Sequence, residues 1–137
     1  MTIDELLDNF SFLDGWEEKY QYVIDLGHKL EPLDEKYKTD DWKIKGCQSQ
    51  VWLVPQIQNG IFHFKGDSDA ILVRGIISIV LLIYNDKTAE EIKNIDIAKI
   101  FVKLGLEENL TPSRRNGMLS MVEKIKQYKV SLKNRVF

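Results

Sequence analysis

The sequence predicts an α+β fold in which helices flank a small antiparallel sheet of two or three strands. Apolar residues recur at helical spacing near both ends of the chain, whereas the middle has two segments of alternating side chains joined by Asn59-Gly60. The chain has 137 residues, of which 44% are hydrophobic and 29% are charged. These values fit one globular domain, residues 1–137, with its own apolar core.

Two helices are predicted at the start of the chain. The segments Thr2-Ile3-Asp4-Glu5 and Asp14-Gly15-Trp16-Glu17 each place a capping residue three positions before a glutamate, which is typical of a helix start. Pro32 ends the second helical pattern because the residue before a proline is disfavoured in a helix. A polar connector of roughly residues 33–41 then leads into the middle of the chain.

A β-hairpin follows this connector. Residues 51–58 alternate between two faces, Asn59-Gly60 supplies a tight turn, and residues 61–64 return as the partner strand. Pro55 has no N–H for a strand ladder, so we expect its strand to lie at an edge or to be bulged. Residues 42–45 could add a third strand.

The rest of the chain is predicted to be helical. Ser68 or Asp67 is placed to cap an apolar core helix that runs to about Tyr84. Three further helices are indicated by their start and stop signals: one beginning at Thr88-Ala89-Glu90-Glu91, one from Asp96 to Leu104 ended by Gly105, and a last amphipathic helix beginning at Thr111-Pro112.

Charge and hydropathy exclude several classes of partner. The net charge is −2, with basic and acidic residues mixed along the chain, so we expect no nucleic acid partner. The apolar run of residues 70–84 is interrupted by Arg74 and is shorter than the roughly 20 residues of a membrane span. Residues 1–5 are acidic and do not resemble a secretion signal. We therefore expect a cytoplasmic protein that does not enter a membrane.

The only cysteine, Cys47, is the first candidate site residue. It follows Gly46 and precedes Gln48, Ser49 and Gln50, whose polar ends would need partners if they were buried. This setting favours an accessible loop, although a lone cysteine is often a buried, inert residue, and the residues alone leave both interpretations open. A single cysteine excludes an internal disulfide.

Two chemistries compete for a lone thiol. A cysteine hydrolase or acyl transferase needs a histidine base close to Cys47, and the only histidines are His28 and His63. They are also too few and too far apart in the sequence to indicate a metal cluster, so we expect no bound metal. Thiol exchange needs only an accessible thiolate and a partner sulfur. Lys43 and Lys45 would favour the thiolate and burial would disfavour it.

Several segments together resemble the SufE family, the sulfur-acceptor proteins of iron–sulfur cluster assembly. The cysteine loop Gly46-Cys47-Gln48-Ser49-Gln50-Val51-Trp52 carries the resemblance most clearly. Four other segments match in family order: Trp16-Glu17-Glu18-Lys19-Tyr20, Asp25-Leu26-Gly27, Gly66-Asp67-Ser68-Asp69-Ala70 with Val73-Arg74-Gly75, and Leu110-Thr111-Pro112-Ser113-Arg114.

The resemblance implies a SufE/IscU-like fold and a persulfide carrier. Cys47 would accept sulfane sulfur from a SufS-type cysteine desulfurase, stimulate that enzyme, and pass the sulfur to the SufB-containing SufBCD scaffold. No cofactor would be bound, because the pyridoxal phosphate belongs to the desulfurase. Asp69 matches a family aspartate that helps to hold the cysteine loop, and Arg114 matches an arginine near the active cysteine. Gly46, Gln48 and Ser49 complete the expected site.

The resemblance leaves alternatives open. The chain could be a CsdE-type acceptor that serves a Csd-type desulfurase, or a non-catalytic adaptor that only docks on the desulfurase. We expect no desulfurase activity of the chain alone, because carbon–sulfur cleavage in this chemistry relies on the electron-sink cofactor. Because persulfides are readily oxidised, we also expect Cys47 to be turned toward the apolar side of its loop, with Asp69 as a latch.

Overall fold

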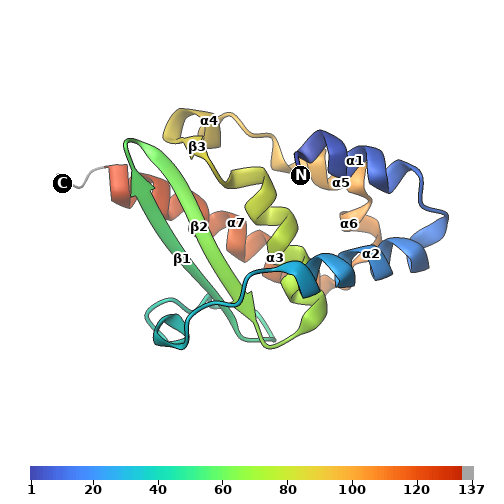
Figure 1. The fold of residues 1–137 in the computed structure, drawn as a ribbon, viewed down its shortest axis with the longest axis horizontal. Coiled ribbons are helices and arrows are strands. Elements are labelled where there is room, and N and C mark those ends of the chain that lie inside the picture. Colours follow the sequence, from blue (N-terminus) through green and yellow to red (C-terminus); the bar gives the residue numbers. More distant parts are fainter. Residues whose placement is uncertain (134–137) are drawn as a thin grey trace.

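A computed structural model describes residues 1–133 and confirms the α+β fold (Figure 1). In chain order its elements are α1 (Ile3–Ser11), α2 (Gly15–Lys29), the short 3-10 helix η1 (Glu35–Tyr37), β1 (Val51–Gln58), β2 (Ile61–Ser68), α3 (Ile71–Tyr84), β3 (Lys87–Thr88), α4 (Ala89–Lys93), α5 (Ile97–Leu104), α6 (Leu106–Asn109) and α7 (Pro112–Lys133). Helix α3 lies between the sheet and α2, and α7 runs beside both α3 and β1.

The sheet has the strand order β1-β2-β3 and is antiparallel throughout. Its hairpin turns at Asn59 and Gly60, whose positive φ values of 53° and 78° suit the tight turn predicted there. Pro55 lies on the edge strand β1, as its missing N–H requires. The expected third strand at residues 42–45 is wrong: that segment makes only an isolated bridge to β1, and β3 pairs with the hairpin instead.

The core lies on the helix-covered face of the sheet. Helix α3 is apolar on nearly every side because the sheet, α2 and α7 all contact it, which confirms the predicted core helix. Gly75 on α3 lets this helix pack directly against α2, since a Cβ at this position would overlap the carbonyl of Val23 on α2. Within residues 1–133, no helix is both long enough and apolar enough to cross a bilayer.

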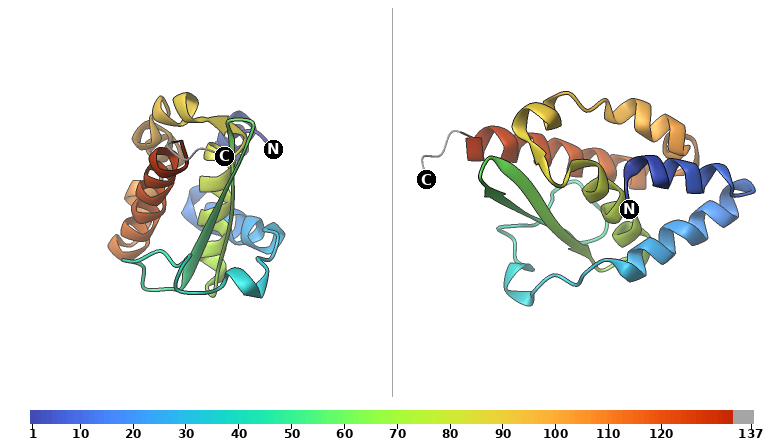
Figure 2. Two further views of the ribbon diagram at one scale, coloured as in Figure 1. Left: turned by 90° about the vertical axis from the view of Figure 1, so that its left-hand side faces the viewer. Right: turned by 45° about the horizontal axis from the view of Figure 1, so that its top comes forward.

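The opposite face of the sheet is covered by the connector between α2 and β1. Trp52 and Val54 point to this face and pack with Leu33, Tyr37 and Trp42 in a second, smaller apolar cluster. In the left view of Figure 2 the segment that follows this cluster, residues 45–50 (teal), passes from the sheet to the start of α7. The connector therefore ends by placing the cysteine loop between a strand and a helix.

Most of the helix-start signals in the sequence, and the predicted helix end at Gly105, are confirmed. Thr2 accepts the N–H of Glu5 at 3.1 Å, Thr88 and Glu91 form a capping box, and Gly105 ends α5 with a φ of 72°.

Two caps and one helix differ from the sequence expectations. The side chain of Asp14 makes no capping bond, and its N–H instead donates to the Glu18 carboxylate at 2.7 Å. The N-cap position of α3 is Ala70, without a side-chain capping bond, rather than Ser68 or Asp67, because β2 continues through Ser68 and the Asp67 carboxylate is paired elsewhere. The four-residue helix α6 was not predicted.

Candidate functional site

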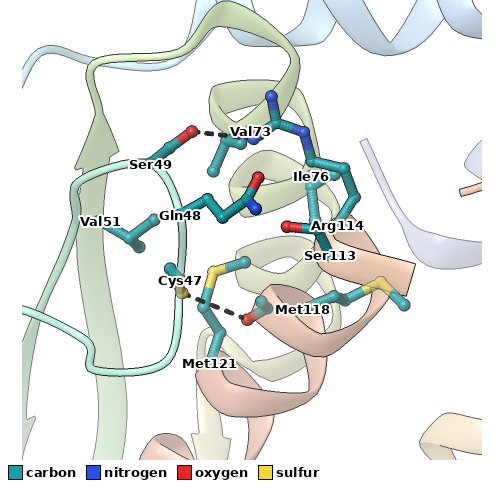
Figure 3. A pocket seen from close by; sticks show the side chains of 11 residues that line it. Cys47, Gln48, Ser49, Val51, Val73, Ile76, Ser113, Arg114, Met118 and Met121 are labelled. Atoms are coloured by element: carbon teal, nitrogen blue, oxygen red, sulfur yellow. Dashed lines mark hydrogen bonds between the residues drawn. The ribbon is translucent and has the colours of Figure 1, made fainter. Parts of the chain in front are cut away.

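Cys47 lies in a short loop that is closed at its base by backbone pairing. The N–H of Ile44 donates to the carbonyl of Val51 at 2.8 Å, and residues 45–50 form the loop between them. Gly46 turns the chain with a φ of 86°, a conformation that favours glycine. The thiol of Cys47 then points under the loop toward α7, where it donates to the carbonyl of Gly117 at 3.9 Å (Figure 3).

A small cavity adjoins this thiol. It has a volume of about 20 Å³, which is room for roughly one water-sized atom. Most of its wall is apolar or backbone and comes from β1, α3 and α7: Val51, Val73, Ile76, Gly117, Met118 and Met121. Gln48, Ser49, Ser113 and Arg114 also line it. Cys47 therefore faces a small, largely apolar cavity with a volume close to that of a single additional atom.

Burial decides the protonation state of the resting thiol. Cys47 is half-buried, and this burial raises the pKa of its thiol above the ordinary value. Lys43 and Lys45 are both exposed to solvent, and burial is the one cause of the shift in this pKa. The competition left open by the sequence is thus won by desolvation, and the closed loop holds a neutral thiol.

Hydrogen bonds from the end of β2 hold the last residue of the loop, Gln50. The N–H of Gln50 donates to Oδ1 of Asp69 at 3.0 Å, and the hydroxyl of Ser68 donates to the Gln50 carbonyl at 2.6 Å. The N–H of Asp69 lies 3.4 Å from the same carbonyl. The backbone N–H and the backbone carbonyl of Gln50 are therefore both held by residues at the end of β2.

Arg114 holds the same loop from the other side. Its Nη1 donates to the hydroxyl of Ser49 at 2.8 Å, so the first turn of α7 is tied to the residue before Gln50 (Figure 3). Gln48 is exposed and contributes to the rim of the cavity. The adjacent Arg115 does not share this role, because its guanidinium donates to the carbonyl of Glu107 at 3.0 Å.

An ion pair with a buried carboxylate fixes the end of β2, next to Asp69. The side chain of Asp67 is 1% exposed and is paired with Arg74. It also accepts the N–H groups of Leu33 and Ser68. Arg74 donates further to the carbonyls of Gly27 and Leu30 at the end of α2. This network joins the connector, β2, α3 and α2 immediately beside Ser68 and Asp69.

The structure does not bring a histidine to the thiol. His63 lies on the outer side of the hairpin, with Nδ1 at 3.4 Å from the carboxylate of Asp86, and His28 is exposed on α2. Neither residue lines the cavity beside Cys47. The hydrolase interpretation therefore has no general base in this arrangement. Among the described residues, no three acidic, histidine or cysteine side chains are grouped as a metal site.

Sequence reasoning missed several residues that build the site. From the sequence, Ser68 is expected only as a helix cap. Gly117, Met118 and Met121 lie within the expected last helix, and none of them is predicted to be a site residue. A glycine inside an otherwise regular helical pattern was the one available signal, because such a glycine often has a packing or functional reason. The methionines gave no signal that separates them from ordinary core residues.

Comparisons with known proteins agree on one family. The SufE family model, described as the Fe-S metabolism associated domain, matches residues 4–129. An uncharacterized SufE-like protein of Rhizobium etli is 48% identical over 130 residues, which cover 92% of this chain and 88% of that protein. Another, of Rhizobium meliloti, is 45% identical over 129 residues, covering 91% of this chain and 92% of that protein.

A solved structure shows the same fold. The solution structure of a hypothetical protein from Thermus thermophilus superimposes with a TM-score of 0.77, covering 98% of this chain and 100% of that one. Their sequences are 16% identical, so this likeness supports the architecture alone.

Proposed function

The chain belongs to the SufE family, which implies a sulfur-transfer role in iron–sulfur metabolism, and we propose that Cys47 is the residue that carries the sulfur. It accepts sulfane sulfur from a SufS-type cysteine desulfurase and passes it to a SufB-containing SufBCD scaffold. One observation carries the proposal: the chain's only thiol faces an apolar cavity with room for one more atom.

The transfer is an exchange between sulfurs with no net change of oxidation state. The thiolate of Cys47 attacks the outer sulfur of a persulfide on the desulfurase cysteine and forms a new sulfur–sulfur bond. The old sulfur–sulfur bond breaks, and the desulfurase cysteine leaves as a thiolate. The products are a Cys47 persulfide and a reduced desulfurase cysteine.

The closed loop is a resting state rather than the reactive one. A thiol whose pKa is raised by burial is a poor nucleophile, because the thiolate is the attacking species. The loop is held mainly by single hydrogen bonds from Ser68, Asp69 and Arg114, each of which contributes on the order of 1 kcal/mol. In this proposal, docking of a desulfurase replaces these bonds and exposes Cys47.

The second transfer must be to another molecule. A persulfide that is attacked at its inner sulfur releases sulfide and forms a disulfide, but this chain has only one cysteine and cannot form that disulfide internally. The outer sulfur is instead taken by an acceptor thiolate of the scaffold, which leaves Cys47 as a thiolate again. Between the two partners the closed loop limits oxidation of the bound sulfur.

Desulfurase stimulation tests the proposal. The parent chain is added to a SufS-type desulfurase with cysteine and a reductant, and sulfide formation is followed beside a Cys47→Ser variant of the same fold. The carrier proposal predicts that stimulation is lost in the variant. Equal stimulation by both proteins would reject it in favour of the adaptor.

Two further arms identify the partners. A Csd-type desulfurase in place of the SufS-type enzyme shows which of the two is stimulated more at equal concentrations, and preference for the Csd-type enzyme would reassign the chain as a CsdE-type acceptor. Chain loaded with labelled sulfur and then mixed with SufBCD should lose its label to SufB. Retention of the label on Cys47 would remove the scaffold from the proposal.

A further inference from the structure

Gly117 occupies a position where glycine has no conformational advantage. It is buried in α7, five residues after the helix begins at Pro112, and it is not among the glycines with positive φ. Glycine is less favourable than alanine inside a helix because more backbone freedom is lost on folding. The backbone of α7 therefore gives no reason for a glycine here.

The contacts around Gly117 in the closed loop, with Cys47 as a free thiol, give no reason for a glycine either. Among residues 1–133, apart from the adjoining parts of α7, the one heavy atom within 4 Å of an added Cβ would be Sγ of Cys47, at an ordinary contact distance of 3.5 Å. Gly27 and Gly75 differ, since a Cβ at either position would run into the backbone of a neighbouring helix. Gly117 thus borders open space, and that space is the cavity beside the thiol.

We propose that Gly117 is a positioning residue that keeps this space free for the outer sulfur of a Cys47 persulfide. The inference rests on the proposed function, because it concerns the loaded form of the same cysteine. A cavity of about 20 Å³ holds roughly one water-sized atom, so a methyl group at position 117 and a second sulfur on Cys47 compete for the same volume. The backbone carbonyl of Gly117 accepts from the thiol in the form that carries no added sulfur, so position 117 lies directly beside the reacting sulfur.

The two forms of Cys47 therefore respond differently to a Gly117→Ala change. The thiol form tolerates the methyl at an ordinary contact distance. The persulfide form becomes overpacked, which shifts its loop toward the open state. A residue that only supports the fold would affect both forms alike.

The persulfide can be made for this test without a desulfurase. Cys47 is first converted to a mixed disulfide with an aryl thiol, and hydrosulfide is then added. Hydrosulfide attacks the sulfur of Cys47, a new sulfur–sulfur bond forms, and the aryl thiolate, which is the better leaving group, departs. Because no partner protein takes part, failure here is distinct from failure of transfer from the desulfurase.

The measurement compares two rates in each protein: reduction of the persulfide by a water-soluble phosphine and alkylation of the thiol. In Gly117→Ala we expect persulfide reduction to accelerate about tenfold, with thiol alkylation changed less than twofold and an unchanged or higher Tm. Asn116→Ala, an exposed position on the same helix, controls for helix propensity and should alter neither rate.

Three results would overturn the inference. They are an unchanged rate of persulfide reduction in Gly117→Ala, an equal acceleration of both rates, and a parent persulfide that reacts as fast as a small-molecule persulfide. If Gly117→Ala does not fold, Val73→Ile adds a methylene to another wall of the cavity and must show the same selective acceleration. An unchanged persulfide rate in Val73→Ile would equally reject the proposal.

Discussion

Replacing Asp69 by alanine removes one defined contact from the cysteine loop. The lost bond is the 3.0 Å hydrogen bond between the N–H of Gln50 and the Asp69 carboxylate. The Gln50 carbonyl keeps its bond from Ser68, and Ser49 keeps its bond from Arg114. The loop is therefore loosened rather than released.

The size of the effect follows from the exposure of the latch. Asp69 is exposed, so water replaces part of the lost bond and the net cost is about 1 kcal/mol. If that cost falls entirely on the closed state of the loop, the open population rises about fivefold. The free energy of unfolding should fall by no more than this cost of about 1 kcal/mol, because the closed loop is part of the native state and the buried network around Asp67 is untouched.

The assay is the rate of Cys47 alkylation in the isolated protein, followed beside thermal unfolding. Asp69→Ala should alkylate about fivefold faster, with a Tm lowered by only a few degrees. Asp96→Ala is the matched control, because Asp96 also accepts one backbone N–H, at 3.2 Å, but at the start of α5. It should lower the Tm and leave alkylation unchanged. An unchanged alkylation rate in a folded Asp69→Ala protein would refute the latch.

Three other predictions concern the same region. Arg114→Ala loses the bond to Ser49 and should raise Cys47 alkylation several-fold (on the order of 1 kcal/mol), whereas an unchanged rate would show that the loop does not depend on α7. Burial raises the pKa of the Cys47 thiol in the folded protein. The stability that comes from keeping this thiol protonated is therefore present in full below the pKa of Cys47 in the unfolded chain, and it is lost as the pH rises through its pKa in the folded chain. The Tm of the parent should thus fall more steeply than that of Cys47→Ser above about pH 8, and parallel curves would contradict this. Arg74→Ala leaves the carboxylate of Asp67 buried beside a more distant lysine and should cost about 3–5 kcal/mol in urea unfolding; a loss below about 1 kcal/mol would mean that the pair is not structural.

Local signals in the sequence predicted the elements well wherever one segment decided the outcome. The Asn59-Gly60 turn and the capping box at Thr88 depend on neighbouring residues only, and both are confirmed. Ser68 and Asp67 failed as helix caps because distant partners compete for them: Gln50 for the first and Arg74 for the second. Such competition cannot be read from a local pattern.

Of the candidate site, the cysteine itself can be predicted from the sequence, whereas the cavity beside it cannot. The polar neighbours of Cys47 are local in the sequence, and the family resemblance that decides its role comes from five segments that can all be read along the chain. The cavity cannot be read in this way, because its walls come from α3 and from α7, and Gly117 is 70 residues from the cysteine that it contacts. Whether burial or a lysine controls the thiol also depended on this packing, which only the three-dimensional structure gives.

The most direct test of the account is the intact mass of the chain after incubation with a SufS-type desulfurase and cysteine, without reductant. A persulfide carrier should gain one sulfur atom, located at Cys47 by peptide mapping, absent from Cys47→Ser and removed by a reductant. An unchanged mass while the desulfurase turns over would contradict the claim that Cys47 carries sulfur.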